Sequence, residues 1–146
     1  NFACLKQLPI LFVLEDNSNV YNPKEWADMV INSYHNHRAD LIVAEKNQGG
    51  DLVESNIRSS FSYAPIKLVH ASKGKMTRAD PVAALYHRGF VHHVGSFTDL
   101  EYQMTHYTGN PNEQSPDRMD ALVWGITELM LNKTMVVRNL DNLGNY

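Results

Sequence analysis

Short apolar runs alternate with amphipathic segments along most of the chain. The short runs are typical of β-strands, whereas segments with apolar residues three or four positions apart are typical of helices. The predicted strands are residues 2–5, 10–14, 41–44, 66–71 and 90–94, and the predicted helices are residues 22–37, 51–59, 76–88, 98–104 and 115–131. This alternation predicts an α/β fold in which helices flank a mixed sheet.

The last predicted helix opens with the segment SPDRMDALVWG, residues 115–125. Ser115 is predicted as the N-cap and Pro116 as the first helical residue, because a proline there loses no intrahelical hydrogen bond. Asp117 and Asp120 are three residues apart and therefore share a helix face. The two carboxylates either cap and solubilise the helix, or they supply oxygen ligands to a hard cation.

Glu45 follows directly after the apolar run of residues 41–44, which is typical of a strand buried on both faces. Ligands of open α/β sheets bind beyond the carboxyl ends of strands, so a carboxylate at this place is a candidate site residue. The next residues, 46–50, form a polar loop with two glycines that includes Asn47. The alternative interpretation is a strand that simply ends in a charged residue before a glycine turn.

A basic segment follows the predicted strand at residues 66–71 and includes Lys73, Lys75 and Arg78 around Gly74. Cations in a glycine-containing loop at a helix start can hold phosphates through charge and backbone N–H groups. The spacing is not that of a P-loop. An ordinary exposed loop remains the alternative, although basic residues prevail between residues 67 and 93 and acidic ones after residue 94.

The composition narrows the range of structures and sites that the chain can form. The 146 residues, with 43% hydrophobic content and a net charge of −3, suit one globular domain, predicted here as residues 1–131 with a tail at 132–146. The single cysteine, Cys4, excludes a disulfide framework and favours an intracellular setting, and no apolar run is long enough to span a membrane. His92 and His93 are adjacent on a strand and point to opposite faces, so a structural role is favoured over metal binding.

Glu45, Asp117 and Asp120 thus form the candidate catalytic and metal-binding group. A site with only oxygen ligands favours Mg²⁺ or Mn²⁺. Two such ions can activate a water and stabilise the leaving oxygen of a phosphodiester. That chemistry needs three or four converging carboxylates, so this set is short of one member.

Several segments together resemble the nuclease domain of the phage terminase large subunit, a family with an RNase H-like fold. They occur in the family's order over residues 8–131. The segments are VLEDNS at 13–18, VAEKNQGG at 43–50, ASKGK at 71–75, RADPV at 78–82, LEYQM at 100–104 and the motif at 115–125.

The resemblance implies a two-metal, Mg²⁺- or Mn²⁺-dependent endonuclease domain that cuts concatemeric viral DNA during head filling. It implies that Glu45 is the second metal-binding acid and that Asp120, with Asp117 beside it, is the helix-borne acid. We expect double-stranded DNA to contact Asn47, Lys73, Lys75 and Arg78. The implied partners are an ATPase domain of the same polypeptide, the portal and the small terminase subunit, with no membrane, at the procapsid in the bacterial cytoplasm.

The chain also departs from the family. The family's first catalytic aspartate lies on a central first strand upstream of residue 2, and Asp16, which follows a later strand, is interpreted as a turn cap. We therefore expect another segment or another copy of the chain to fill that strand's place, or the strands to pair differently. The alternatives are a non-catalytic prophage remnant or docking module that keeps the fold, and, more weakly, another RNase H-like nuclease such as a junction resolvase.

Overall fold

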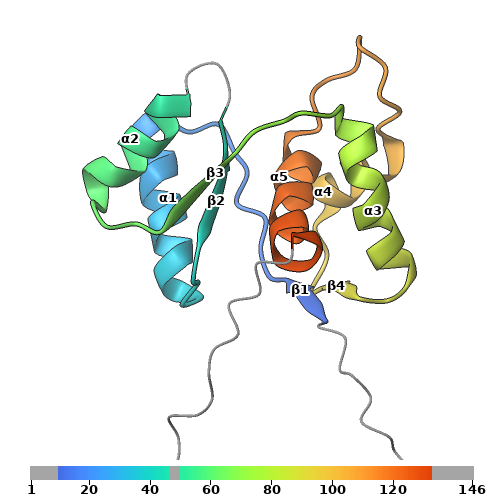
Figure 1. The fold of residues 1–146 in the computed structure, drawn as a ribbon, viewed down its shortest axis with the longest axis horizontal. Coiled ribbons are helices and arrows are strands. Elements are labelled where there is room, and N and C mark those ends of the chain that lie inside the picture. The colour runs from blue at the N-terminus through green and yellow to red at the C-terminus, as the bar shows by residue number, and fades with distance from the viewer. Residues whose placement is uncertain (1–9, 47–49, 133–146) are drawn as a thin grey trace, which may run out of the picture.

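The computed structural model describes residues 10–46 and 50–132, which fold into short strands and helices in alternation (Figure 1). The predicted strand at residues 2–5 and the predicted tail beyond residue 132 lie outside the described residues. The elements are β1 (Leu11–Val13), α1 (Pro23–Asn36), β2 (Ile42–Glu45), α2 (Gly50–Ser60), β3 (Ile66–Val69), α3 (Lys75–His87), β4 (Val91–His93), α4 (Thr98–His106) and α5 (Asp117–Ile126), which continues into a π-helical turn, η1 (Thr127–Leu131).

The described strands form two separate parallel pairs. β1 lies beside β4, with Leu11 opposite Val91, and β2 lies beside β3, with Ile42 opposite Ile66. The α/β class is confirmed, but within residues 10–46 and 50–132 the pairing is parallel rather than mixed. A helix connects β2 to β3, and a crossover of this kind returns the chain in the same direction, which produces a parallel pair.

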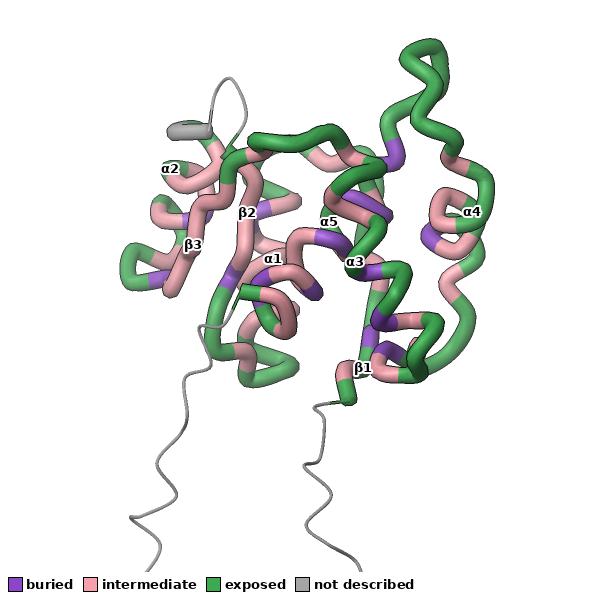
Figure 2. Tube along the Cα trace, turned by 45° about the vertical axis from the view of Figure 1, so that its right-hand side comes forward, coloured by how far each residue is buried: buried purple, intermediate pink, exposed green. Residues whose placement is uncertain are grey.

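Each strand pair has its own hydrophobic core, so the described chain has two halves. In one half, α1 and α2 pack against β2 and β3 around Ile42 and Ile57. In the other half, α3, α4 and α5 pack around β1 and β4, with Val123 and Ile126 among the most buried residues. Figure 2 accordingly shows buried residues spread over both halves rather than gathered at one centre.

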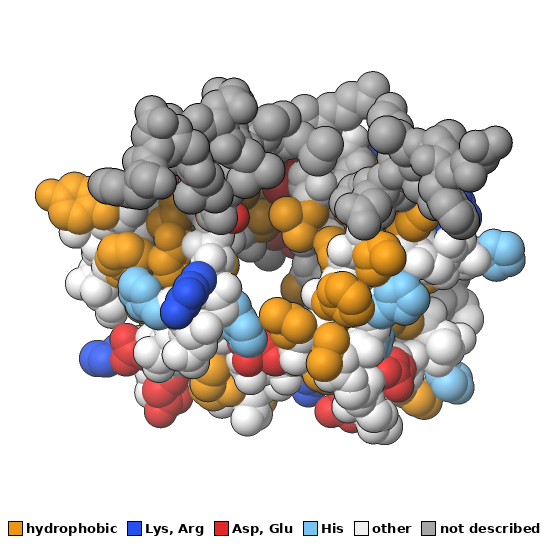
Figure 3. All heavy atoms as spheres, turned by 90° about the horizontal axis from the view of Figure 1, so that it is seen from below, with side chains coloured by type: hydrophobic (Ala, Val, Ile, Leu, Met, Phe, Trp, Pro, Cys, Tyr) orange, Lys and Arg blue, Asp and Glu red, His pale blue; other side chains and the backbone are white. Residues whose placement is uncertain are grey.

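Among residues 10–46 and 50–132, the two strand pairs do not join into one sheet. A groove of about 690 Å³ lies between them, lined by side chains that include Val13 on β1, Ile42 on β2 and Leu122 on α5. Figure 3 shows the molecule hollowed between its two halves when viewed from below. The expectation that another segment or another copy of the chain supplies a central strand stays a prediction.

Helix α1 begins as its sequence predicts. The side chain of Asn22 accepts hydrogen bonds from the backbone nitrogens of Lys24 (3.1 Å) and Glu25 (3.0 Å). Glu25 in turn accepts from the backbone nitrogen of Asn22 at 3.0 Å, which completes a capping box. This local pattern satisfies backbone donors that would otherwise have no partner, and it fixes where the helix starts.

The predicted start of α5 is wrong in detail. The N-cap is Pro116 rather than Ser115, and helical geometry begins at Asp117. The Ser115 hydroxyl does not cap the helix but lies 2.5 Å from Lys75 Nζ. The first backbone donors of α5 bind instead to a side chain from α4, that of Gln103. Lys75 thus takes up the Ser115 hydroxyl, and the side-chain amide of Gln103 caps the helix in place of the local cap that the sequence predicts.

Candidate functional site

Glu45 and Asp120 come from different halves of the molecule and face each other across a pocket. Glu45 is the last residue of β2, and its side chain is 25% exposed. Asp120 lies in the first turn of α5, and its side chain is only 8% exposed. The pocket, of about 480 Å³, is lined by Val43, Glu45, Lys75, Ser115, Asp117, Asp120, Ala121 and Trp124.

The Arg78 guanidinium lies between these two carboxylates. Its Nη2 atom is 2.5 Å from Asp120 Oδ1, and its Nη1 atom is 3.8 Å from Glu45 Oε1. Nη1 also donates to the carbonyl oxygen of Lys73 at 3.2 Å. Arg78 comes from the first turn of α3, and its side chain is nine-tenths buried, so it is an internal cation rather than a surface one.

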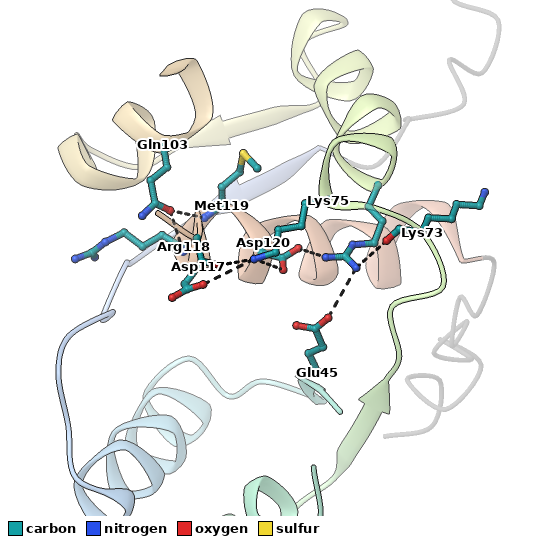
Figure 4. Close-up of polar contacts among 10 residues, drawn as sticks. Glu45, Lys73, Lys75, Gln103, Asp117, Arg118, Met119 and Asp120 are labelled. Carbon is teal, nitrogen blue, oxygen red and sulfur yellow. Dashed lines mark hydrogen bonds and ion pairs between the residues drawn. The ribbon is translucent and has the colours of Figure 1, made fainter. Parts of the chain in front are cut away.

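Lys75 is a second cation at the same site (Figure 4). Its Nζ atom lies 3.4 Å from Asp120 Oδ2 and 3.9 Å from Asp117 Oδ1. Asp117 differs sharply from Asp120, because its side chain is 83% exposed. Although the two aspartates share a helix face as predicted, only Asp120 is held inside the site.

Trp124 forms the floor beneath the arginine. The Arg78 guanidinium carbon lies 4.6 Å from the centre of the indole ring, which is the geometry of a cation–π contact. Trp124 is partly buried on α5. Two buried nitrogens here, Arg78 Nε and Trp124 Nε1, have no hydrogen-bond partner among the described residues.

A comparison with known protein families identifies the chain. Residues 13–129 match the family described as the terminase RNaseH-like domain. The chain belongs to this family. No curated protein and no solved structure matches it. The resemblance seen in the sequence is thereby confirmed over most of its predicted extent, and the terminase domain is of the nuclease type found in packaging terminases.

The acids of the terminase domain fit a hard cation as two of its ligands. Glu45 and Asp120 are oxygen donors from separate elements, and both already approach one positive charge, that of Arg78. Within residues 10–46 and 50–132, however, no three His, Cys, Asp or Glu side chains lie close enough together to hold a metal ion. The described part of the terminase domain therefore offers a partial ligand set.

The four predicted DNA-binding residues have different positions. Lys75 and Arg78 point into the acidic site and pair with its carboxylates. Lys73 is exposed, and its side chain points away from the acids (Figure 4). Asn47 lies outside the described residues. Only Lys73 is thus clearly free to meet a phosphate while Lys75 and Arg78 hold their present partners.

Two residues that support the site, Gln103 and Asp16, were not predicted as site residues. Gln103 Oε1 accepts hydrogen bonds from the backbone nitrogens of Arg118 (3.0 Å) and Met119 (3.1 Å). Asp16, predicted as a turn cap, does accept from the backbone nitrogen of Ser18 at 3.1 Å. It also lies 2.7 Å from Arg118 Nη1, so it anchors the same first turn of α5.

His92 and His93, for which the sequence favours a structural role, both contact other groups of the domain. His93 Nε2 lies 2.8 Å from the Tyr86 hydroxyl, and His93 Nδ1 lies 3.0 Å from Glu101 Oε1. His92 Nε2 lies 2.9 Å from the carbonyl oxygen of Gly89. These contacts join α3, β4 and α4.

Among the described residues, no helix is long and apolar enough to cross a membrane.

Proposed function

We propose that the terminase domain is a Mg²⁺- or Mn²⁺-dependent endonuclease that hydrolyses phosphodiester bonds of concatemeric double-stranded DNA. The observation that carries this proposal is the convergence of Glu45 and Asp120 on a single cation, Arg78, from the end of β2 and the start of α5. Because β2 and α5 belong to different halves, Glu45 and Asp120 are brought together by the fold and not by being close to each other in the sequence.

In this proposal Glu45 and Asp120 are the metal ligands, and Asp117 lies at the rim, where it keeps Lys75 near the pocket mouth. The bound ions would activate a water and stabilise the leaving oxygen at the scissile phosphate. Lys73, whose side chain is exposed, would bind a neighbouring phosphate by charge. Asn47 remains a proposed DNA contact from the loop after β2.

Membership of the terminase RNaseH-like family supports a wider proposal. We propose that the domain acts at the procapsid in the bacterial cytoplasm, together with an ATPase domain of the same polypeptide, the portal and the small terminase subunit. The additional ligand that a two-metal site requires would come from a segment beyond those described, on the expected central first strand.

Plasmid nicking and metal binding together test the proposal. Supercoiled plasmid should be nicked in Mg²⁺ or Mn²⁺, and calorimetry should detect Mn²⁺ binding. Glu45→Gln and Asp120→Asn should each remove both signals. The matched controls Glu54→Gln and Asp28→Asn change acids that form helix ion pairs away from the pocket, and should leave both signals intact. If Glu45→Gln and Asp120→Asn cut as fast as the unsubstituted protein, the site assignment is wrong.

One observation favours a second candidate, a non-catalytic docking module that keeps the fold. Both inner carboxylates are already paired with cations, and the described residues supply no group of three acids. A protein that binds no divalent ion at millimolar concentration, yet folds normally, would support this candidate over the nuclease.

A further inference from the structure

We infer that Arg78 is an internal counter-ion that competes with the metal for Glu45 and Asp120, and that DNA relieves this competition by taking over the guanidinium. The inference rests on the proposed function, because it concerns how the same two carboxylates are shared between a resident arginine and an added ion.

The first reason is position. Arg78 reaches Asp120 at 2.5 Å and Glu45 at 3.8 Å, and its side chain is nine-tenths buried. A divalent ion shared by these carboxylates would require the positive guanidinium to leave the space between them, because like charges at such distances repel strongly in a partly buried site. Metal binding and the present position of Arg78 are therefore mutually exclusive.

The second reason is charge balance. The two inner carboxylates, Glu45 and Asp120, face two cations, Arg78 and Lys75, so the centre is neutral as it stands. A divalent ion beside Lys75 would leave the centre with an excess of positive charge even after Arg78 has moved aside. Phosphates of a DNA backbone would offset that excess, so metal and DNA should each raise the affinity for the other.

The third reason is that Arg78 is suited to a phosphate partner. Its Nε atom has no hydrogen-bond partner among the described residues, although it is buried. A guanidinium binds phosphate with two parallel N–H donors, and Nε is commonly part of such a fork. Arg78 also donates to the Lys73 carbonyl, so it already lies beside the basic loop that carries the exposed Lys73 side chain.

Lys75 is less suited to this role. Its ammonium also contacts Ser115 and the exposed Asp117, so it retains partners at the rim when Asp120 binds a metal. Arg78 has no other acid partner among the described residues. The competition should therefore depend mainly on Arg78.

The test measures Mn²⁺ affinity by electron paramagnetic resonance, with and without a short DNA duplex. For the unsubstituted protein, the duplex should tighten Mn²⁺ binding. Arg78→Gln should bind Mn²⁺ roughly threefold or more tightly than the unsubstituted protein without DNA, since a competing charge is gone, and should show little further gain with DNA. Arg88→Gln is the matched control, because Arg88 ends the same helix and stacks on Phe90 rather than on an acid. It should behave like the unsubstituted protein.

Arg78→Lys keeps the charge and loses the two-pronged donor. It should bind Mn²⁺ as the unsubstituted protein does and should lose most of the DNA-induced gain. If Arg78→Gln is unstable without metal, Mn²⁺ should restore its folded circular dichroism, because the ion replaces the missing cation. Failure to restore it overturns the inference.

Two failures are distinguishable. If Mn²⁺ binding to the unsubstituted protein is absent or does not depend on Glu45, the proposed function fails and the inference fails with it. If that binding depends on Glu45 but Arg78→Gln leaves the affinity unchanged or weaker, the inference alone is overturned.

Discussion

The amide oxygen of Gln103 lies 3.0 Å from the backbone nitrogen of Arg118, so a side chain on α4 caps the start of α5. The same oxygen accepts from the next backbone nitrogen at 3.1 Å. Because Pro116 at the N-cap position offers no side-chain acceptor, these donors have no local alternative. The position of the buried Asp120 therefore depends on a residue of another helix.

Replacing Gln103 by alanine should lower the free energy of unfolding by about 1 kcal/mol, because two backbone donors lose their acceptor. It should also weaken Mn²⁺ binding, since Asp120 belongs to the same helical turn. Gln103→Glu keeps the oxygen acceptor and should restore both properties. Urea denaturation and calorimetry give the two readouts. Gln114→Ala, in the exposed loop before α5, is the control. Equal effects for Gln103→Ala and this control would show that the cap is unimportant.

The ion pair between Asp16 and Arg118 should make stability depend on acid pH. Burial alone would raise the pKa of Asp16, but hydrogen bonds from Ser18 and Arg118 outweigh burial and lower the pKa. A carboxyl whose folded pKa lies below its unfolded value stabilises the fold above the unfolded pKa, about 3.9. That stabilisation is lost as the pH falls through the lower, folded value.

Asp16→Asn should therefore cost about 2 kcal/mol at neutral pH and flatten the acid limb of the stability curve. The measurement is urea denaturation between pH 2 and 7. Asp99 contacts the same arginine at 3.3 Å but is 76% exposed, so Asp99→Asn should cost less than about 0.5 kcal/mol. Equal costs for the two variants would contradict the assigned role of Asp16.

Lys67 on β3 and the buried Glu128 on η1 pair across the two halves of the domain. Lys67→Met should lower the free energy of unfolding by about 3 kcal/mol, because it leaves a buried carboxylate without its cation. The double variant Lys67→Met/Glu128→Leu should recover much of that loss. Thermal and urea unfolding provide the measurement. A single variant as stable as the unsubstituted protein would show that the pair contributes little.

The Tyr86 hydroxyl should lose its proton only at an unusually high pH. Burial, with a smaller effect from the negative charge of Glu101, raises the pKa of the Tyr86 hydroxyl. A group whose folded pKa is raised stabilises the fold below its unfolded pKa, about 10, and this contribution is lost as the pH rises through the folded value. The unsubstituted protein should therefore lose stability above about pH 10, and Tyr86→Phe should lose less. Alkaline urea titrations decide between these outcomes; parallel curves for the two proteins would contradict the burial of this hydroxyl.

The sequence predicted most elements to within a few residues, because their signals are local. The start of α1 is one example, since the donors and acceptors of its capping box at Asn22 and Glu25 lie within four residues. The pairing of strands is not local, and the mixed sheet that the pattern suggested is replaced by two parallel pairs in the described residues. The predicted cap at Ser115 was wrong because Lys75, forty residues earlier, takes its hydroxyl.

The candidate site was only partly predictable for the same reason. Glu45 and Asp120 were expected to meet, and they do lie on either side of one cation. The sequence assigned Arg78 to phosphate, because a basic loop before a helix suggests no other partner. Its place between two acids depends on how α3 packs against α5 and how α5 packs against β2, and no spacing within the chain encodes that packing.

The division of the described chain into two cores has a mechanical consequence. Glu45 belongs to one core and Asp120 to the other, so whatever cation they share also fastens the halves together. An ion bound there would hold the two halves together, and a more tightly bound ion would make the whole domain more rigid. Binding of an ion at the pocket would therefore be coupled to how firmly the two halves are held together.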